Sequence, residues 1–284
     1  MLTLRAPAKI NLTLEVLRRR PDGYHDIASV LQTIALEDIL TIEPAPDTSF
    51  TCDHPGLSGP DNLVVKAAHL LQAKYRVKQG ALLHLQKRIP VAAGLGGGSS
   101  DAAAALRGLV ELWDLHPTKE EIAELAQSLG SDVPFFLRGG TAVAEGRGER
   151  LTPLRSLPPA WAVVLHPPLT LEGKTGRMYA ALQPGDFSSG QATFRLARAV
   201  EQGEAVEPSL FHNCFHAVAT RLFSQLKTFE WRFLEAGAPW VSLAGSGPCL
   251  FTLVMTRAEA GVIHQGLLDQ SEQAYMAETV PRVP

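Results

Sequence analysis

Four of the five positions from Gly94 to Gly98 are glycine, in the stretch P-V-A-A-G-L-G-G-G-S-S-D that runs from Pro90 to Asp101. Glycine loses more entropy on folding than any other residue and buries no side chain, so such a cluster serves backbone geometry rather than packing. It permits positive φ angles and a close approach of a ligand to main-chain N–H groups. The chemistry that this loop favours is the binding of an anion, and a polyphosphate is the anion we expect.

The residues behind the glycines predict the start of a helix. Ser99, Ser100 and Asp101 are good N-cap residues, and the alanine run that follows them has high helix propensity. We therefore expect a helix from about Ser100 to Trp113, whose free N–H groups and dipole attract negative charge. The alternative interpretation is a flexible loop ahead of an alanine-rich helix.

Neither of the two common phosphate-binding patterns fits this loop. A Walker A loop requires G-x-x-x-x-G-K-[ST], and the G-K-T triple at Gly173, Lys174 and Thr175 has Pro168 where the first glycine belongs. A Rossmann pattern counted from Gly94 ends on Ser99 instead of glycine or alanine. The loop therefore indicates a phosphate site of a less common type.

Two charged residues are candidates for transfer chemistry. Lys9 and Asn11 share the polar face of a strand whose other face is apolar, so they face either solvent or a cleft. Asp132 follows a helix end, where a carboxylate either caps the next turn or serves as a base. Beside a phosphate site such a base accepts a hydroxyl proton during phosphoryl transfer, and a lysine near it would keep it ionised.

Two further loops have both an ordinary and a functional interpretation. In D-G-Y-H, from Asp22 to His25, Tyr24 either packs in the core or offers a ring for stacking, with His25 contacting polar edges of the stacked group. The small-residue loop from Ser242 to Pro248 is either a plain turn between strands or the second wall of the same cleft.

The hydrophobic pattern predicts a chain of mixed strands and helices. Strands are expected at residues 10–16, 27–36, 38–42, 81–85, 140–145 and 160–165, on either side of Gly245, and as a last edge strand at 274–279. Helices are expected at 63–75, 118–130, 175–182, 192–202, 213–235 and 258–268, and an exposed connection at 47–59. Strands come first as a group, so the class is α+β. We expect two domains, 1–155 and 156–284, divided near the proline-rich segment 153–159.

Composition narrows the function classes. The 284 residues carry a net charge of −3, which argues against nucleic acid or an anionic membrane as partner. The three cysteines form no C-x-x-C pair, and no histidine pair has ligand spacing, so we expect no protein-built metal site. No signal peptide or membrane span is evident, and reduced thiols are typical of the cytoplasm, where we expect this protein to act.

Three segments resemble the three motifs of the GHMP kinases, which wrap ATP phosphates without a Walker A sequence. They are Pro7–Leu12, Pro90–Ser100 and Leu243–Phe251. P-A-K-I-N-L, D-G-Y-H, the triple glycine and the run G-S-D-V-P-F-F-L-R-G-G-T-A-V-A-E-G-R-G-E from Gly130 to Glu149 are most similar to one group of these kinases. That group phosphorylates the 2-hydroxyl of 4-diphosphocytidyl-2-C-methyl-D-erythritol in non-mevalonate isoprenoid synthesis.

The resemblance implies a two-domain α+β kinase with its active site in the interdomain cleft, using ATP and Mg²⁺. It implies a catalytic pair at Lys9 and Asp132. The implied ATP loop comprises Pro90, Val91, Ala92, Ala93, Gly94, Leu95, Gly96, Gly97, Gly98, Ser99 and Ser100. The implied substrate contacts are Asn11, Tyr24, His25, Thr175 and Tyr179, with cytosine stacked on Tyr24. In the segment that holds Thr175 and Tyr179, Glu172 and Lys174 depart from the usual serine- and threonine-rich turn of the family.

Two alternatives stay open from the sequence. One is another GHMP-type kinase, acting on homoserine or mevalonate, but an aromatic ring and an imidazole at Tyr24 and His25 suit a cytosine better than a small aliphatic alcohol. The other is a nucleotide-binding protein that has lost catalysis. Such a protein is expected to lose Lys9 or Asp132, and both are present.

Overall fold

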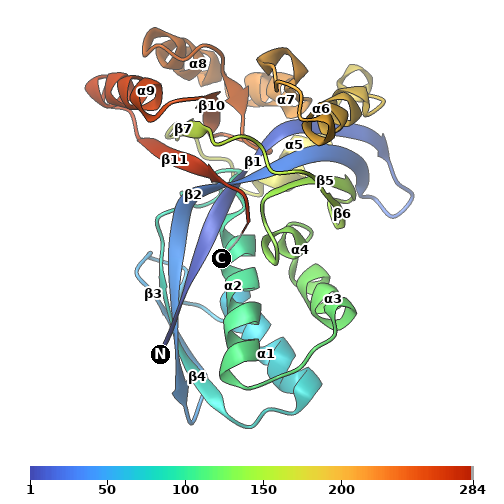
Figure 1. Ribbon diagram of the computed structural model, residues 1–284, viewed down its shortest axis with the longest axis vertical. Coiled ribbons are helices and arrows are strands. Elements are labelled where there is room, and N and C mark those ends of the chain that lie inside the picture. The colour runs from blue at the N-terminus through green and yellow to red at the C-terminus, as the bar shows by residue number, and fades with distance from the viewer. Residues whose placement is uncertain (283–284) are drawn as a thin grey trace.

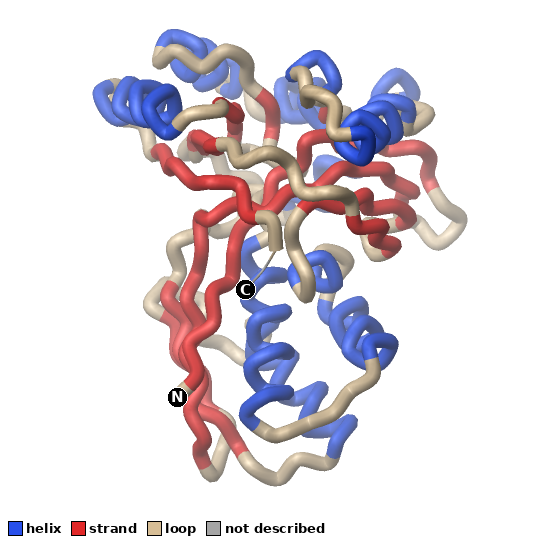
Figure 2. The backbone as a smooth tube through the Cα atoms, in the orientation of Figure 1, coloured by secondary structure: helices blue, strands red, loops and turns tan. Residues whose placement is uncertain are grey.

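The computed structural model describes residues 1–282 and is built around one long antiparallel hairpin. Its strands are β1 (Leu2–Arg19) and β2 (His25–Ala45), and they run from the lower to the upper half of the molecule in Figures 1 and 2. Register shifts interrupt the pairing between Pro7 and Ala8 and between Asn11 and Thr13. Such irregularities increase local twist and bend the strands, here on both sides of Lys9.

The lower half adds two strands and four helices to this hairpin. Strand β4 (Gly80–Gln86) pairs with the end of β2, and β3 (Ser49–Cys52) pairs with β4 in parallel. Helices α1 (Leu63–Tyr75) and α2 (Gly97–Leu112) lie beside this sheet, followed by α3 (Lys119–Leu129) and the single turn α4 (Val133–Phe136) (Figure 1). The apolar faces of these elements form one buried core.

The upper half contains the remaining strands. Strand β5 (Thr141–Gly146) pairs with β2, and β6 (Arg150–Pro153) pairs with β5. On the other side of β2, the hydrogen-bonded strands of the sheet follow in the order β11 (Ala274–Val280), β7 (Trp161–Leu165), β10 (Leu250–Val254) and β9 (Ser242–Leu243). The two-residue strand β8 (His212–Asn213) pairs with β1.

Helices cover the outer side of these upper strands (Figure 1). They are α6 (Gln191–Gln202), α7 (Phe215–Leu222), α8 (Leu226–Glu235) and α9 (Arg257–Asp269). Helix α5 (Lys174–Ala180) lies on the other side of these strands. Two short 3-10 turns cover Pro184–Asp186 and Pro208–Leu210. The mixture of sheet and helix confirms the α+β class. The division into domains 1–155 and 156–284 stays a prediction.

Local sequence signals explain two helix starts. The side chain of Asn62 accepts a hydrogen bond from the Val64 amide at the start of α1. Thr118 and Glu121 form the predicted capping box at the start of α3. These caps satisfy N–H groups that the first turn of a helix leaves without partners, so both boundaries are readable from sequence.

Other sequence expectations were wrong, and the reasons are tertiary. The predicted helix 213–235 is two helices, because Phe223 leaves the helical conformation and is buried in the core. The segment 47–59 is not all exposed connection, because β3 adds to the free edge of β4. Segments 27–36 and 38–42 are one strand. Strand β11 is not at the edge of the sheet, since it pairs with β7 through residues 274–278 and with β2 through Thr279 and Val280.

Candidate active site

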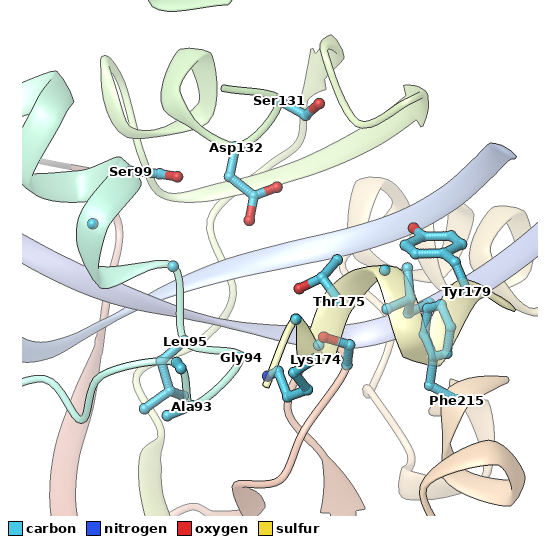
Figure 3. Close-up of a pocket in the computed structure, with 18 of the residues that line it drawn as sticks. Ala93, Gly94, Leu95, Ser99, Ser131, Asp132, Lys174, Thr175, Tyr179 and Phe215 are labelled. Carbon is cyan, nitrogen blue, oxygen red and sulfur yellow. The ribbon is translucent and has the colours of Figure 1, made fainter. Parts of the chain in front are cut away.

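The glycine loop, β1 and α5 line one large cleft with a volume of about 1700 Å³. The turn between β1 and β2, the segment ahead of α4 and the loop at Gly245 and Ser246 complete its walls. In Figure 3, Ser99, Ser131 and Asp132 lie on one side, and Lys174, Thr175 and Tyr179 on α5 lie on another. The cleft therefore brings together most residues that the sequence singled out.

Glycine is required at two places in the loop because the backbone of the cleft is crowded. Gly94 has a φ of +87°, and a Cβ there would lie 2.1 Å from the carbonyl oxygen of Ala244. Gly96 has a φ of +74°, and its Cβ would lie 2.8 Å from the ring of Phe136. At Gly98, by contrast, a Cβ would have no described protein atom within 4 Å. Gly98 thus leaves open space on the cleft side of the loop.

Helix α2 begins within the loop, at Gly97, and this corrects the expected start near Ser100. Its N-cap is Gly96, with no side-chain cap, so the amides of the first turn stay available to a ligand. Gly97, Gly98 and Ser99 line the cleft at this point. A helix N-terminus with uncapped amides attracts anions, and the binding of a polyphosphate at this loop stays a prediction.

Ser100 and Asp101 are buried instead of capping the helix. The Lys87 ammonium, just ahead of the loop, donates to Asp101 at 2.8 Å and to Asp38 at 2.5 Å. This buried cluster ties together the two ends of the glycine loop. Asp101 acts in the fold as an anchor for α2, which the cap interpretation missed.

The loop at Gly245 packs directly against the glycine loop. A Cβ on Gly245 would lie 2.7 Å from the carbonyl oxygen of Gly94. The side-chain amide of Asn213 donates to the carbonyls of Leu243 and Gly245, both at 2.8 Å, and so holds this loop in place. The second small-residue loop is therefore a wall of the same cleft.

Lys9 and Asp132 meet inside the cleft although they come from distant parts of the chain. The Lys9 Nζ lies 3.8 Å from Oδ2 of Asp132. Lys9 is only 5% exposed, whereas the Asp132 side chain is 41% exposed and open to a ligand. Burial lowers the pKa of Lys9 below its ordinary value, and the Asp132 carboxylate opposes that shift.

Hydrogen bonds fix the position of the Lys9 ammonium. It donates to Oδ1 of Asn11 at 2.7 Å and to the carbonyl of Gly94 at 3.1 Å. The amide nitrogen of Asn11 in turn donates to the Ser29 hydroxyl at 2.8 Å. Asn11 thus holds the catalytic candidate in place, and its predicted contact with cytosine stays a prediction.

Aromatic side chains gather at the other end of the cleft. The rings of His25 and Tyr179 stack with centroids 4.9 Å apart, and Phe215 meets Tyr179 edge-on at 4.9 Å. Burial and the nearby Arg19 charge lower the pKa of His25, which favours a neutral imidazole. A neutral imidazole can both donate and accept hydrogen bonds.

Tyr24 is 53% exposed, so it does not pack in the core, and it lines the cleft. The Arg147 guanidinium carbon lies 3.8 Å from the centroid of its ring. An exposed ring backed by a cation suits stacking with a planar group. Thr175 is also exposed and lines the cleft at the start of α5.

Sequence reasoning missed three contributors to this site: Lys174, Arg147 and Phe215. Arg147 stands within the G-R-G-E part of the motif from Gly130 to Glu149, but no spacing rule connects it with Tyr24. Lys174 belongs to the G-K-T triple that failed the Walker A pattern. Phe215 has no sequence signal beyond being apolar.

Residues 1–282, the part of the chain that the structure describes, lack two features. No group of three or more His, Cys, Asp or Glu side chains gathers there in a way that could hold a metal ion. No helix there has the length and apolar character needed to cross a bilayer.

Comparison with known proteins places this geometry in a family. The model of the GHMP kinases N terminal domain matches residues 62–140. A Dehalococcoides mccartyi protein named 4-diphosphocytidyl-2-C-methyl-D-erythritol kinase is 44% identical over 281 residues, covering 99% of each chain. A Brevibacillus brevis protein of the same name is 39% identical, covering 94% of this chain and 92% of that protein.

Solved structures agree. A crystal structure of 4-(cytidine 5'-diphospho)-2C-methyl-D-erythritol kinase aligns with a TM-score of 0.82 at 36% identity, covering 98% of this chain and 99% of that one. With identities well above 30% over nearly the whole length, the recognition of three kinase motifs in the sequence is confirmed. The chain belongs to the 4-diphosphocytidyl-2-C-methyl-D-erythritol kinases, a family with the GHMP kinase fold.

Proposed function

We propose that this protein transfers the γ-phosphoryl group of ATP to the 2-hydroxyl of 4-diphosphocytidyl-2-C-methyl-D-erythritol. The hydroxyl oxygen forms a bond to the γ-phosphorus while the bond to the β,γ-bridging oxygen breaks. The products are the 2-phosphate and ADP, and the hydroxyl proton goes to a base. This assignment rests on family membership and on the cleft described above.

The observation that carries the proposal is the contact of Lys9 with Asp132 beside the glycine loop. Asp132 is the exposed member of the pair and carries the carboxylate, so it is the group that accepts the hydroxyl proton. Lys9 keeps this carboxylate ionised and neutralises charge that develops on the transferring phosphoryl group. Asn11 and the Gly94 carbonyl hold Lys9 for both tasks.

ATP binds with its phosphates on the loop from Pro90 to Ser100. The uncapped amides at the start of α2 and the open space at Gly98 suit a close approach of phosphate oxygens. Mg²⁺ prefers oxygen ligands and retains water. The hydroxyls of Ser99 and Ser131 line this part of the cleft and fit an ion held mainly by phosphate and water. When bound, Mg²⁺ neutralises phosphate charge.

The aromatic end of the cleft receives the cytidyl group. Tyr24 offers an exposed face for stacking, and His25 and Tyr179 form the facing aromatic pair. Thr175 lies on α5, one helical turn before Tyr179, and lines the cleft, where it contacts the phosphoryl acceptor. A kinase for homoserine or mevalonate has no use for these rings, which is why we favour the cytidyl substrate.

We further propose that the protein acts in the cytoplasm as an enzyme of small metabolites, with neither nucleic acid nor membrane as partner. A net charge of −3 supports this view. The proposed domains are residues 1–155 and 156–284, which share the cleft.

The direct test is ADP release from ATP and Mg²⁺ with each of three acceptors: the cytidyl-methylerythritol compound, mevalonate and homoserine. We expect ADP with the cytidyl compound alone, and inhibition of that reaction by CMP. ADP release with mevalonate or homoserine instead would overturn the substrate. No ADP with any acceptor, despite measurable ATP binding, would favour a protein without catalysis.

A further inference from the structure

Lys174 places a second buried ammonium in the cleft, in addition to Lys9. It is the first residue of α5, is only 9% exposed, and extends toward the glycine loop in Figure 3. Its Nζ donates to the carbonyl of Gly247. Among the described residues, this is its one hydrogen bond, and no carboxylate forms an ion pair with it. Since an ammonium has three N–H donors, two remain for a ligand.

Within residues 1–282 no carboxylate pairs with Lys174, whereas Asp132 lies 3.8 Å from the Lys9 ammonium. Burial, together with the nearby Lys9 charge, lowers the pKa of Lys174 to about 8. Cys249 also faces Lys174, but a buried thiol whose pKa is raised gives no negative charge at neutral pH. Glu172 on the same segment is exposed to solvent. The Asp132 carboxylate lies beside Lys9, so the Lys174 charge is a surplus positive charge in this part of the cleft and favours an anionic ligand.

The position of Lys174 indicates which anion it meets. Its hydrogen-bond partner, the Gly247 carbonyl, lies 3.0 Å from where a Cβ on Gly94 would stand. Gly94 is also the residue whose carbonyl accepts from Lys9. Lys9 and Lys174 thus approach the same point of the glycine loop from β1 and from α5, with Asp132 opposite.

We infer that Lys174 donates to the transferring phosphoryl group, so that the γ-phosphate of ATP is held between Lys9 and Lys174 during transfer. The inference deepens the proposed function and rests on it for the reaction, but it concerns ATP and not the identity of the acceptor. Lys174 is thereby a catalytic residue on the side of α5. The competing interpretation is structural: Lys174 would merely tie α5 to the loop at Gly247.

The first test measures nucleotide binding and needs no acceptor. The affinities of ADP and of β,γ-imido-ATP, each with Mg²⁺, are compared by calorimetry for wild type and Lys174→Met. A charge-assisted hydrogen bond to the γ-phosphate contributes enough that we expect β,γ-imido-ATP to bind about 10-fold more weakly, with ADP unchanged. Equal weakening of both ligands, or weakening of neither, would overturn the inference.

The second test measures turnover with the acceptor that wild type uses. We expect Lys174→Met to lower kcat about 100-fold with little change in KM for the acceptor, as for loss of one group that stabilises transition-state charge. Lys174→Arg keeps the charge and should recover part of kcat. Arg177→Gln, an exposed charge on the same helix, is the matched control and should behave as wild type.

The two tests separate failure of the inference from failure of the proposed substrate. If wild type does not phosphorylate the cytidyl compound, the binding comparison still decides about Lys174. Thermal unfolding of each variant checks that it folds. If Lys174→Met does not fold, Lys174→Arg and Lys174→Gln carry the same comparison, and an unchanged preference for β,γ-imido-ATP in Lys174→Gln would refute the inference.

Discussion

The carboxylate of Asp132 and the ammonium of Lys9 face each other across 3.8 Å at the mouth of the glycine loop. The Lys9 ammonium is buried and held by two hydrogen bonds, whereas the Asp132 side chain is exposed. This asymmetry supports the proposed roles, in which the ammonium is a fixed positive charge and the carboxylate reaches the hydroxyl. Phosphoryl transfer depends mainly on such positioning and electrostatics.

The Asp132 carboxylate should be needed for turnover and not for nucleotide binding. Asp132→Asn removes the base but keeps the size of the side chain. We expect kcat to fall about 100- to 10,000-fold, the usual cost of losing a general base, with ATP affinity within about threefold of wild type. Steady-state kinetics and calorimetry measure these quantities. A variant with near-normal kcat would show that Asp132 is not the base.

The glycines of the loop should differ in their tolerance of alanine. Gly94→Ala places a Cβ against the Ala244 carbonyl at a positive φ, so we expect a lower melting temperature and loss of activity. Gly98→Ala meets no described protein atom, so its melting temperature should equal that of wild type while ATP binds more weakly. Thermal unfolding and ATP titration check both. Normal ATP affinity in Gly98→Ala would argue against phosphate contact at that residue.

The Tyr24 ring should contribute to acceptor binding alone. Stacking of a base on an aromatic ring contributes about 1–3 kcal/mol, so Tyr24→Leu should raise KM for the cytidyl substrate about 10-fold or more and leave KM for ATP unchanged. Tyr24→Phe keeps the ring and serves as control. Because Tyr24 is exposed, neither variant should alter the melting temperature. A rise in KM that is equal in both variants would assign the effect to the hydroxyl instead of stacking.

Lys174 should reduce the stability of the empty enzyme in a pH-dependent way. Its pKa is about 8 in the folded state against an ordinary value of 10.5, so the unfolded chain binds more protons between these values. The destabilisation is complete below pH 8 and fades as pH rises to 10.5. Without nucleotide, Lys174→Met should therefore melt at a higher temperature than wild type at pH 7, with a smaller difference at pH 10. Melting curves at the two pH values test this, and a difference that does not shrink would contradict the assigned titration.

Local signals in the chain were sufficient for much of the framework. The cap at Asn62, the capping box at Thr118 and the glycines around Gly94 act over a few residues, so their effect is visible without the fold. Helix α2 shows the limit of such signals. Three good N-cap residues pointed to a start near Ser100, yet the helix starts at Gly97 behind the left-handed residue Gly96, and Asp101 lies within the helix in a buried cluster with Lys87.

The site itself needed contacts between distant parts of the chain. The motif resemblance implied that Lys9 and Asp132 belong to the same active site. The distance between Nζ and Oδ2 and the unequal exposure of the two side chains depend on how β1 bends past the segment ahead of α4. Arg147 over Tyr24 and Lys174 beside Gly247 join residues far apart in sequence. Burial and charge are properties of the packed surroundings. For that reason a lysine in a rejected Walker A pattern becomes, in the fold, a buried cation with no carboxylate partner among residues 1–282, beside the Gly247 carbonyl and the glycine loop.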